Sequence, residues 1–217
     1  MRAIFETSFY YVYLAFIIGL GIYLLIKKKS VYFSLACIIL GAGDAFHLIP
    51  RAIGLYTKTL DNPSTELAMY LGIGKLITSI TMTLFYILMY LCIYQRVGKK
   101  RPLCLNITVG VLALARFILL AFPQNGWTVN GNDIYWGLYR NIPFILLGML
   151  VIYLLAKYFR GIKHLRLLFI ADILSFAFYL PVVFLASTYS WVGLLMLPKT
   201  ICYMWIAIAG YLDIKKQ

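Results

Sequence analysis

Seven long apolar runs dominate this sequence and restrict what the chain can fold into. Each run approaches or exceeds the roughly 20 residues that a helix needs to cross the hydrocarbon core of a membrane. Lipid offers the backbone no hydrogen-bond partner, so a run of this kind crosses as a helix. We therefore predict an all-α, polytopic transmembrane helical bundle of about seven spans, in which residues 1–217 form a single transmembrane domain. The predicted spans are Phe9–Ile26, Val31–Ile49, Leu67–Tyr94, Leu103–Phe122, Leu138–Ala156, Leu167–Ser187 and Trp191–Tyr211.

The composition excludes a soluble domain of this size. Hydrophobic residues make up 63% of the chain and charged residues 12%, with a mean hydropathy of +0.88. A soluble domain is about a quarter charged. A core built from 217 residues cannot hide the excess of apolar side chains, so the solvent around them must be lipid.

The basic residues divide unequally between the two sets of predicted loops. One set, together with the C-terminus, holds Lys27, Lys28, Lys29, Arg96, Lys99, Lys100, Arg101, Lys157, Arg160, Lys163, Arg166, Lys215 and Lys216, and the other holds Arg2, Arg51, Lys58 and Arg140. Basic loops stay on the cytoplasmic side, which predicts an outside N-terminus and a cytoplasmic C-terminus. That arrangement needs an odd number of spans. We expect an integral protein of a bacterial plasma membrane.

The net charge of +13 does not indicate nucleic-acid binding, because it lies in short loops and forms no nucleic-acid-binding motif. The four cysteines form no CxxC pair, and no disulfide framework, metal site or cofactor is expected. The expected partner is the bilayer. A homo-oligomer is compatible with the sequence.

Ionisable residues occur inside the apolar runs, where each costs at least about 2.5–3.5 kcal/mol to insert. They are Asp44, His47, Lys75, Arg116, Asp172 and Lys199. Asp44, His47 and Arg51 follow a spacing of three and four residues, which places them on one face of a helix. Most of these charges fall in the outer halves of the spans, and Arg140 opens span five from the same side. Asp172 falls in the cytoplasmic half of span six.

Two interpretations of these charges remain open. They could form buried ion pairs that fix helix packing, with Asp44 joined to Lys75 or Arg116 and Asp172 joined to Lys199. Alternatively, they could line a polar pocket that binds a charged ligand or performs acid chemistry. Hydroxyl side chains within the spans could line the same pocket or bond helix carbonyls; they are Thr78, Ser79, Thr81, Thr83, Thr200 and Tyr203.

Two short motifs resemble a known family. The segment Leu40–Arg51, with its Gly43-Asp44 pair and Pro50, resembles the Gly-Asp helix of the lysoplasmalogenase-like (YhhN-type) membrane proteins. The segment Phe169–Phe176 resembles the late-span motif of that family, with Ala171 in place of its usual Ser. The chain departs from the family pattern in having seven spans rather than eight and no Lys-Pro motif before the Gly-Asp helix.

The resemblance implies hydrolysis of the vinyl ether bond of a lysoplasmalogen, which releases a fatty aldehyde. Protonation of carbon gives an oxocarbenium ion that water attacks, so one carboxyl must donate a proton while another stays ionised. Asp44 and Asp172 are the candidates for this catalytic pair. His47 could orient water or a carboxylate. The resemblance makes a lipid or lysolipid substrate the expected partner. Its phosphate could be held near the outer surface by Arg51, Lys75, Arg116 and Arg140. Lys199 is a further candidate for binding the substrate.

Other classes of protein would use the same charges differently. A small transporter or binding protein would use them for substrate or proton coupling, and would show counterflow in liposomes without forming a product. A retinal protein would use Lys199 as a Schiff base, although span three offers Lys75 where an acidic counterion is needed. A structural membrane subunit is a further alternative.

Overall fold

The computed structural model describes residues 2–60, 62–129, 133–163, 165–185 and 189–216. Within these ranges the chain is helical and has no strand. Seven helices are long and apolar enough to cross a membrane, which confirms the predicted number of spans. They are α1 (Arg2–Ile26), α2 (Val31–Tyr56), α3 (Thr65–Val97), α4 (Leu103–Ala121), α5 (Ile134–Phe159), α6 (Leu168–Leu185) and α7 (Met196–Lys215). Short 3₁₀ helices occupy Pro123–Asn125, Trp127–Val129 and Ser190–Leu195.

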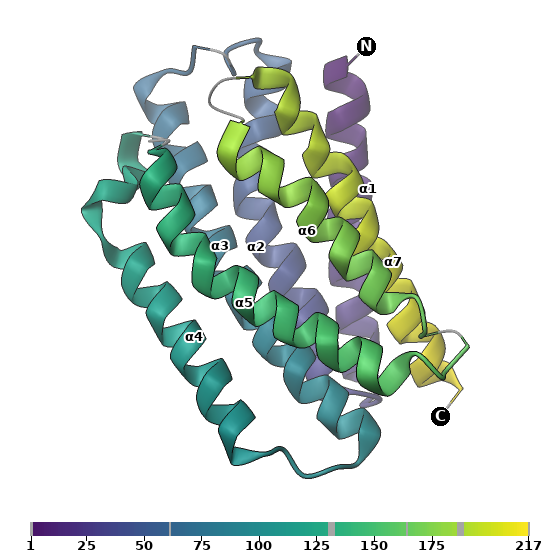
Figure 1. Cartoon of the computed structure of the whole chain (residues 1–217). Helices are drawn as coiled ribbons and strands as arrows, with labels where there is room; N and C mark the ends of the chain where they lie inside the picture. Colours follow the sequence, from purple (N-terminus) through teal and green to yellow (C-terminus); the bar gives the residue numbers. More distant parts are fainter. Residues whose placement is uncertain (1, 61, 130–132, 164, 186–188, 217) are drawn as a thin grey trace.

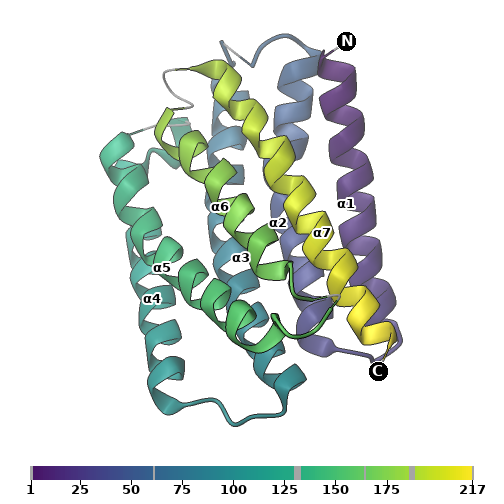
Figure 2. The ribbon, with the colours of Figure 1, turned by 45° about the vertical axis from the view of Figure 1, so that its right-hand side comes forward.

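Six of the helices close into a ring, and α4 lies outside it. Successive contacts join α1 to α2, α2 to α3, α3 to α5, α5 to α6, α6 to α7 and α7 back to α1. The α4 helix packs mainly on α5 and touches α3 only lightly. Figures 1 and 2 show the helices side by side, with the N-terminus and the C-terminus at opposite ends of the bundle. Five of the six ionisable residues predicted inside the spans lie on helices of this ring, and Arg116 lies on α4.

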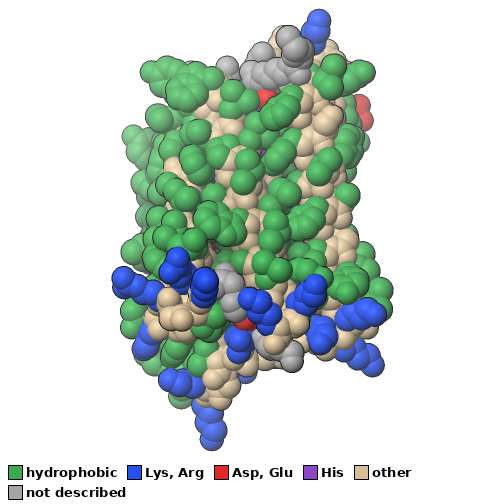
Figure 3. Space-filling model, turned by 90° about the vertical axis from the view of Figure 1, so that its right-hand side faces the viewer, with side chains coloured by type: hydrophobic (Ala, Val, Ile, Leu, Met, Phe, Trp, Pro, Cys, Tyr) green, Lys and Arg blue, Asp and Glu red, His purple; other side chains and the backbone are tan. Residues whose placement is uncertain are grey.

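The two ends of the bundle differ in charge. Figure 3 shows a wall of hydrophobic side chains and a dense girdle of Lys and Arg at the end that holds the C-terminus. We call this the basic end, and the opposite end, with the α2–α3 and α6–α7 connections, the N-terminal end. A cytoplasmic basic end remains the prediction of the positive-inside rule.

Helix boundaries differ from the prediction mainly at polar turns. The α2 helix does not stop at Pro50 but continues through Arg51 to Tyr56. A proline removes one backbone donor, and helices in a membrane tolerate that loss when neighbouring elements support them. The predicted span seven begins as the 3₁₀ helix Ser190–Leu195, which places Lys199 in the first turn of α7. The predicted end of span six at Ser187 lies outside the described residues.

Caps and turns fix the ends of the other helices. Ser64 accepts a hydrogen bond from the backbone of Leu67 at the start of α3, and Asp133 accepts bonds from Tyr135 and Trp136 at the start of α5. Gly98 ends α3 with a φ of 69°, in the left-handed region that favours glycine. These local signals hold the helices in register where the chain leaves the membrane.

Close packing of α2 against α3 depends on small residues. Gly43 lies against Thr81, and its carbonyl accepts a bond of 3.0 Å from the hydroxyl of Thr78. Gly74 meets the backbone of α2 itself, since a Cβ there would lie 2.9 Å from the Cα of His47 and closer still to the carbonyl oxygen of Phe46. Small residues allow helix backbones in membranes to approach in this way.

Gly74→Ala is therefore expected to lower stability by about 1–3 kcal/mol, because α2 must shift to admit the new methyl group. Gly110→Ala is the matched control, since Gly110 lies on α4 with nothing within 4 Å of a built Cβ. The midpoint of thermal unfolding in a neutral detergent should fall for Gly74→Ala and stay level or rise for Gly110→Ala. Equal midpoints for the two variants would contradict the close contact.

Candidate functional site

One cavity at the N-terminal end gathers the charges that the sequence singled out. It has a volume of about 690 Å³ and is lined by residues of α1 to α7 and of the connections at this end. Its six cationic side chains are Arg51, Lys58, Lys75, Arg116, Arg140 and Lys199, and His47 lies among them. All six predicted substrate-binding residues thus meet in one place. Among the described lining residues there is no Asp or Glu.

The rest of the lining is largely apolar. It includes Leu55, Leu60, Leu71, Met82, Phe144, Val182, Val183 and Met196. A cavity with strong positive charge and apolar walls suits a ligand that has an anionic group and a hydrocarbon portion. The position and the partners of each cation show which part of a ligand it can bind.

Arg51 is held by an acid from α1. Its Nη2 lies 3.5 Å from Oε2 of Glu6, and its Nε donates a bond of 3.1 Å to the hydroxyl of Tyr10. Tyr10 in turn donates to Glu6 at 2.9 Å. Glu6 is buried and offsets part of the charge of Arg51. Arg51 is therefore positioned before any ligand binds.

Arg140 is positioned by the loop between α4 and α5. Its Nη1 donates a bond of 2.8 Å to Oδ1 of Asn125, and its guanidinium lies 4.6 Å from the centre of the Trp127 ring. The Asn125 amide donates to the carbonyls of Leu119 and Phe122, which close the end of α4. Neither Asn125 nor Trp127 belongs to a motif, so the sequence did not identify their role in positioning Arg140.

Arg116 is the most deeply buried cation in the cavity wall. Only 1% of it is exposed, and its guanidinium lies 3.8 Å from the centre of the Phe144 ring. Two of its nitrogens, Nε and Nη1, are buried without a hydrogen-bond partner. A buried donor without a partner costs about 1–3 kcal/mol, and a charged one costs more. A free-energy cost of this size indicates that Arg116 has a role beyond packing.

Lys199 is the second deeply buried cation. It is 4% exposed, and its Nζ lies 4.7 Å from the ring centre of Tyr179 and 5.4 Å from that of Tyr203. Tyr179 donates a bond of 2.7 Å to Oδ1 of Asn141, whose amide donates to the carbonyl of Gly137. Lys199 is thus steadied by aromatic faces. Sequence reasoning did not single out Tyr179, Asn141 or Phe144, because uncharged residues in an apolar run carry no distinguishing pattern.

The serine and threonine hydroxyls considered from the sequence bond helix carbonyls, and two of them also line the cavity. Ser79 bonds the carbonyl of Lys75, and Thr78 bonds that of Gly43. Thr78 and Ser79 line the cavity. The Thr81, Thr83 and Thr200 hydroxyls bond carbonyls one turn earlier on their own helices. The Nδ1 atom of His47 is buried without a partner, which leaves it available to a ligand or to water.

Neither predicted catalytic acid lines the cavity. Asp44 is 8% exposed and its Oδ2 accepts a bond of 2.7 Å from the hydroxyl of Tyr13 on α1. It lies one helical turn from His47 on the same face of α2, next to the Gly43 carbonyl that Thr78 contacts. Lys199 is within electrostatic range of Asp44. Asp44 therefore lies just beyond the cavity wall.

Asp172 lies farther from the cavity, behind aromatic rings. Its Oδ1 accepts a bond of 2.6 Å from the hydroxyl of Tyr86, whose ring centre is 5.3 Å from that of Phe144 and 5.6 Å from that of Phe176. Phe144 lines the cavity and Tyr86 does not. We refer to Tyr86, Phe144, Phe176 and Tyr179 as the aromatic layer. It separates Asp172 from the cavity.

The ion pairs that were considered from the sequence do not form. Within the described residues, Asp44 and Asp172 each bond a tyrosine, and no cation lies within 4 Å of either carboxylate. Ion pairs among the described residues instead join Glu6 to Arg51 and Arg96 to Asp213. The cations of the cavity and the two buried acids thus occupy adjacent but separate sites.

Comparison of the chain with protein-family models, with curated proteins and with solved structures finds no match.

Proposed function

We propose that the chain binds a single-chain, phosphate-bearing amphiphile of the lysolipid class, with its head group in the cavity at the N-terminal end. One observation carries the proposal: six cations line the cavity and no acid does so among the described lining residues. Arg and Lys favour phosphate, which Arg can hold through two parallel hydrogen bonds. The apolar part of the lining would take the start of the hydrocarbon chain.

Arg116 and Lys199 are the cations best suited to the phosphate. Both are deeply buried, and each has an aromatic ring on one side. Two nitrogens of Arg116 have no hydrogen-bond partner, and the oxygens of a buried anion would accept bonds from them. Arg51 and Arg140 are already bonded to Glu6 and Asn125, and would form the outer part of the binding site.

Titration calorimetry of the purified protein in a neutral maltoside detergent tests this proposal. The ligands are 1-oleoyl-glycerol-3-phosphate and 1-oleoyl-glycerol, which share a tail and differ in the phosphate. We expect the phosphate ester to bind at least tenfold more tightly, with an affinity that falls as salt is added. Equal binding of the two ligands would overturn the proposal.

Hydrolysis of a lysoplasmalogen vinyl ether is the second candidate, and the position of Asp44 favours it. Asp44 lies one turn from His47, which lines the cavity. The proton would go to the vinyl carbon remote from the ether oxygen, and water would add to the oxocarbenium carbon while returning a proton to the carboxylate. The hemiacetal would then collapse to aldehyde and alcohol. Asp172, which accepts a bond from Tyr86 behind the aromatic layer, would stay ionised and stabilise the developing positive charge from a distance.

Liposomes that contain the protein separate hydrolysis from transport. Given a lysoplasmalogen, a hydrolase releases fatty aldehyde. A transporter exchanges labelled lysolipid between the leaflets without forming aldehyde, and a binding protein does neither. Aldehyde release by the wild type is the result expected for the hydrolase, and its absence from well-folded protein would remove that candidate while leaving the binding proposal intact.

A further inference from the structure

A second cation-lined pocket lies at the basic end, remote from the cavity described above. It has a volume of about 470 Å³ and lies between the end of α3 and the start of α4. Its lining residues are Tyr32, Leu91, Tyr94, Gln95, Lys99, Lys100, Arg101 and Asn106. All eight are described, and none of them is acidic.

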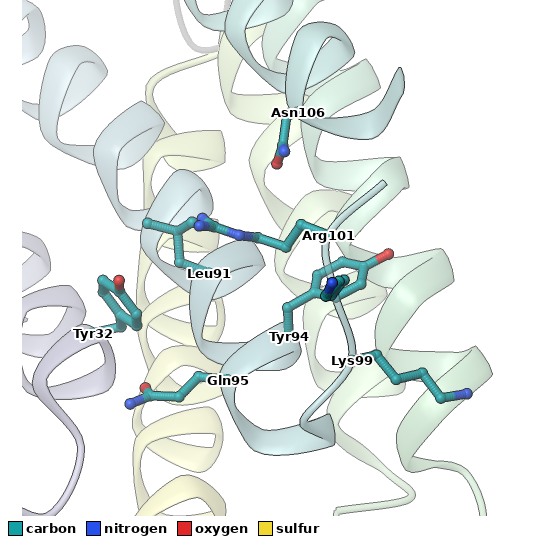
Figure 4. A pocket seen from close by; sticks show the side chains of 8 residues that line it. Tyr32, Leu91, Tyr94, Gln95, Lys99, Arg101 and Asn106 are labelled. Atoms are coloured by element: carbon teal, nitrogen blue, oxygen red, sulfur yellow. The ribbon is translucent and has the colours of Figure 1, made fainter. Parts of the chain in front are cut away.

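The local sequence explains why three cations meet here. Gly98 turns the chain out of α3 with a φ of 69°, and Pro102 starts α4. Lys99, Lys100 and Arg101 fill the short connection between them. Figure 4 shows the Arg101 side chain extending across the pocket toward Leu91, between Asn106 and Tyr94. Arg101 thus brings positive charge into the pocket, whereas Lys99 lies at its edge and points away, with its Nζ 5.4 Å from the centre of the Tyr158 ring.

Neutral donors complete the lining. The hydroxyl of Tyr90 donates a bond of 2.8 Å to Oδ1 of Asn106, which fixes that amide and leaves its Nδ2 as a donor. Gln95 supplies a second amide, and Tyr32 and Tyr94 supply hydroxyl groups. Cations, amides and hydroxyls are the groups that bind phosphate oxygens in proteins.

The surroundings indicate a ligand that also contacts the bilayer. The α4 helix touches α3 only lightly, and it exposes large apolar side chains from its first turns onward. Leu103 is 73% exposed and Ile107 is 56% exposed. A lipid whose head group lies in the pocket would place its tails along this face. Basic pockets between helices on the cytoplasmic side are known to suit such head groups.

We infer that the pocket formed by the α3–α4 connection binds the phosphate of an anionic membrane phospholipid, whose tails lie along α4. This site is independent of the cavity at the N-terminal end. The observation that carries the inference is the set of three consecutive cations over an acid-free lining beside an exposed apolar helix face.

Native mass spectrometry of delipidated protein tests the site, with dioleoyl phosphatidylglycerol and dioleoyl phosphatidylcholine as matched probes and inorganic phosphate as a third. The variant Lys99→Gln/Lys100→Gln/Arg101→Gln empties the pocket of charge. The control variant Arg160→Gln/Lys163→Gln/Arg166→Gln removes the same charge from exposed positions on the α5–α6 connection at the same end.

We expect the wild type and the control to bind phosphatidylglycerol at least tenfold more tightly than phosphatidylcholine, and the pocket variant to lose about 10- to 100-fold in affinity for phosphatidylglycerol. Tighter binding of inorganic phosphate than of phosphatidylglycerol would show that the pocket is a site for free phosphate, and would overturn the inference that it binds a lipid. Equal losses in the two variants would mean general surface attraction and would also overturn the inference.

Discussion

Replacing Arg116 by methionine is expected to stabilise the empty protein and to abolish most of its affinity for a lysolipid phosphate. The side chain is 1% exposed, with two nitrogens that have no partner, so its removal relieves a cost. Methionine fills a similar space against Phe144 with no charge to bury. We expect a gain of about 1–3 kcal/mol in the free energy of unfolding, in line with replacements of buried charges by apolar residues. We expect a loss of about 10- to 100-fold in affinity for 1-oleoyl-glycerol-3-phosphate.

Arg96→Met is the matched control, with the opposite expected pattern. Arg96 donates to Asp213 through two bonds of 2.6 and 3.1 Å at the basic end. Its removal leaves a buried carboxylate with less compensation, so stability should fall while lysolipid binding stays unchanged. Thermal unfolding and titration calorimetry on both variants measure the two effects. If Arg116→Met lowered stability as Arg96→Met does, Arg116 would be a structural residue.

Asp44→Asn is expected to reduce aldehyde release at least 100-fold if the chain cleaves vinyl ethers, because an amide cannot donate a proton to carbon. The asparagine carbonyl can still accept the bond from Tyr13, so the fold and the binding of lysolipid should persist. A coupled assay for fatty aldehyde, with calorimetry on the same preparation, separates lost chemistry from lost binding.

Asp172→Asn and Asp213→Asn complete the comparison. Asp172 is buried behind the aromatic layer, so its replacement should also reduce aldehyde release while the bond from Tyr86 is kept. Asp213 pairs with Arg96 at the other end of the bundle, and its replacement should leave turnover unchanged. Full activity in Asp44→Asn would exclude this residue as the proton donor.

The number and type of spans follow from the sequence because the bilayer leaves the backbone no alternative to the helix. The ends of those spans were less predictable. The apolar run of α2 weakens at Pro50, yet the helix extends to Tyr56 and carries Arg51 into the cavity wall. Only the packing of α1 and α3 around this last turn, which the sequence does not display, explains its persistence.

The sequence predicted that the cations gather at one end of the bundle, because they lie at similar depths within their spans. It did not predict which side chains contact the buried charges. His47, Lys75 and Lys199 fall at similar depths once orientation is assigned, and depth alone brings them to one end. The tyrosines that hold the acids come from far along the chain. Tyr13 lies 31 positions from Asp44, and Tyr86 lies 86 positions from Asp172. A tyrosine in an apolar run also suits a membrane interface, so the sequence did not identify these pairs.

The sequence also could not show that Asp44 and Asp172 lie outside the cavity. The spacing of Asp44, His47 and Arg51 correctly placed them on one side of α2. The boundary between the cavity and the core, however, is set by Phe144 and Tyr179 from other helices. Side chains from other helices, which are distant in the sequence, determine which residues on one face of α2 reach a ligand.

The most direct test of the central claim is an experimental structure of the protein with 1-oleoyl-glycerol-3-phosphate bound. The account predicts density for the phosphate in the cavity at the N-terminal end, within hydrogen-bond distance of Arg116 and Lys199, and the acyl chain against the apolar lining. Phosphate density at any other site, with the cavity empty, would contradict it.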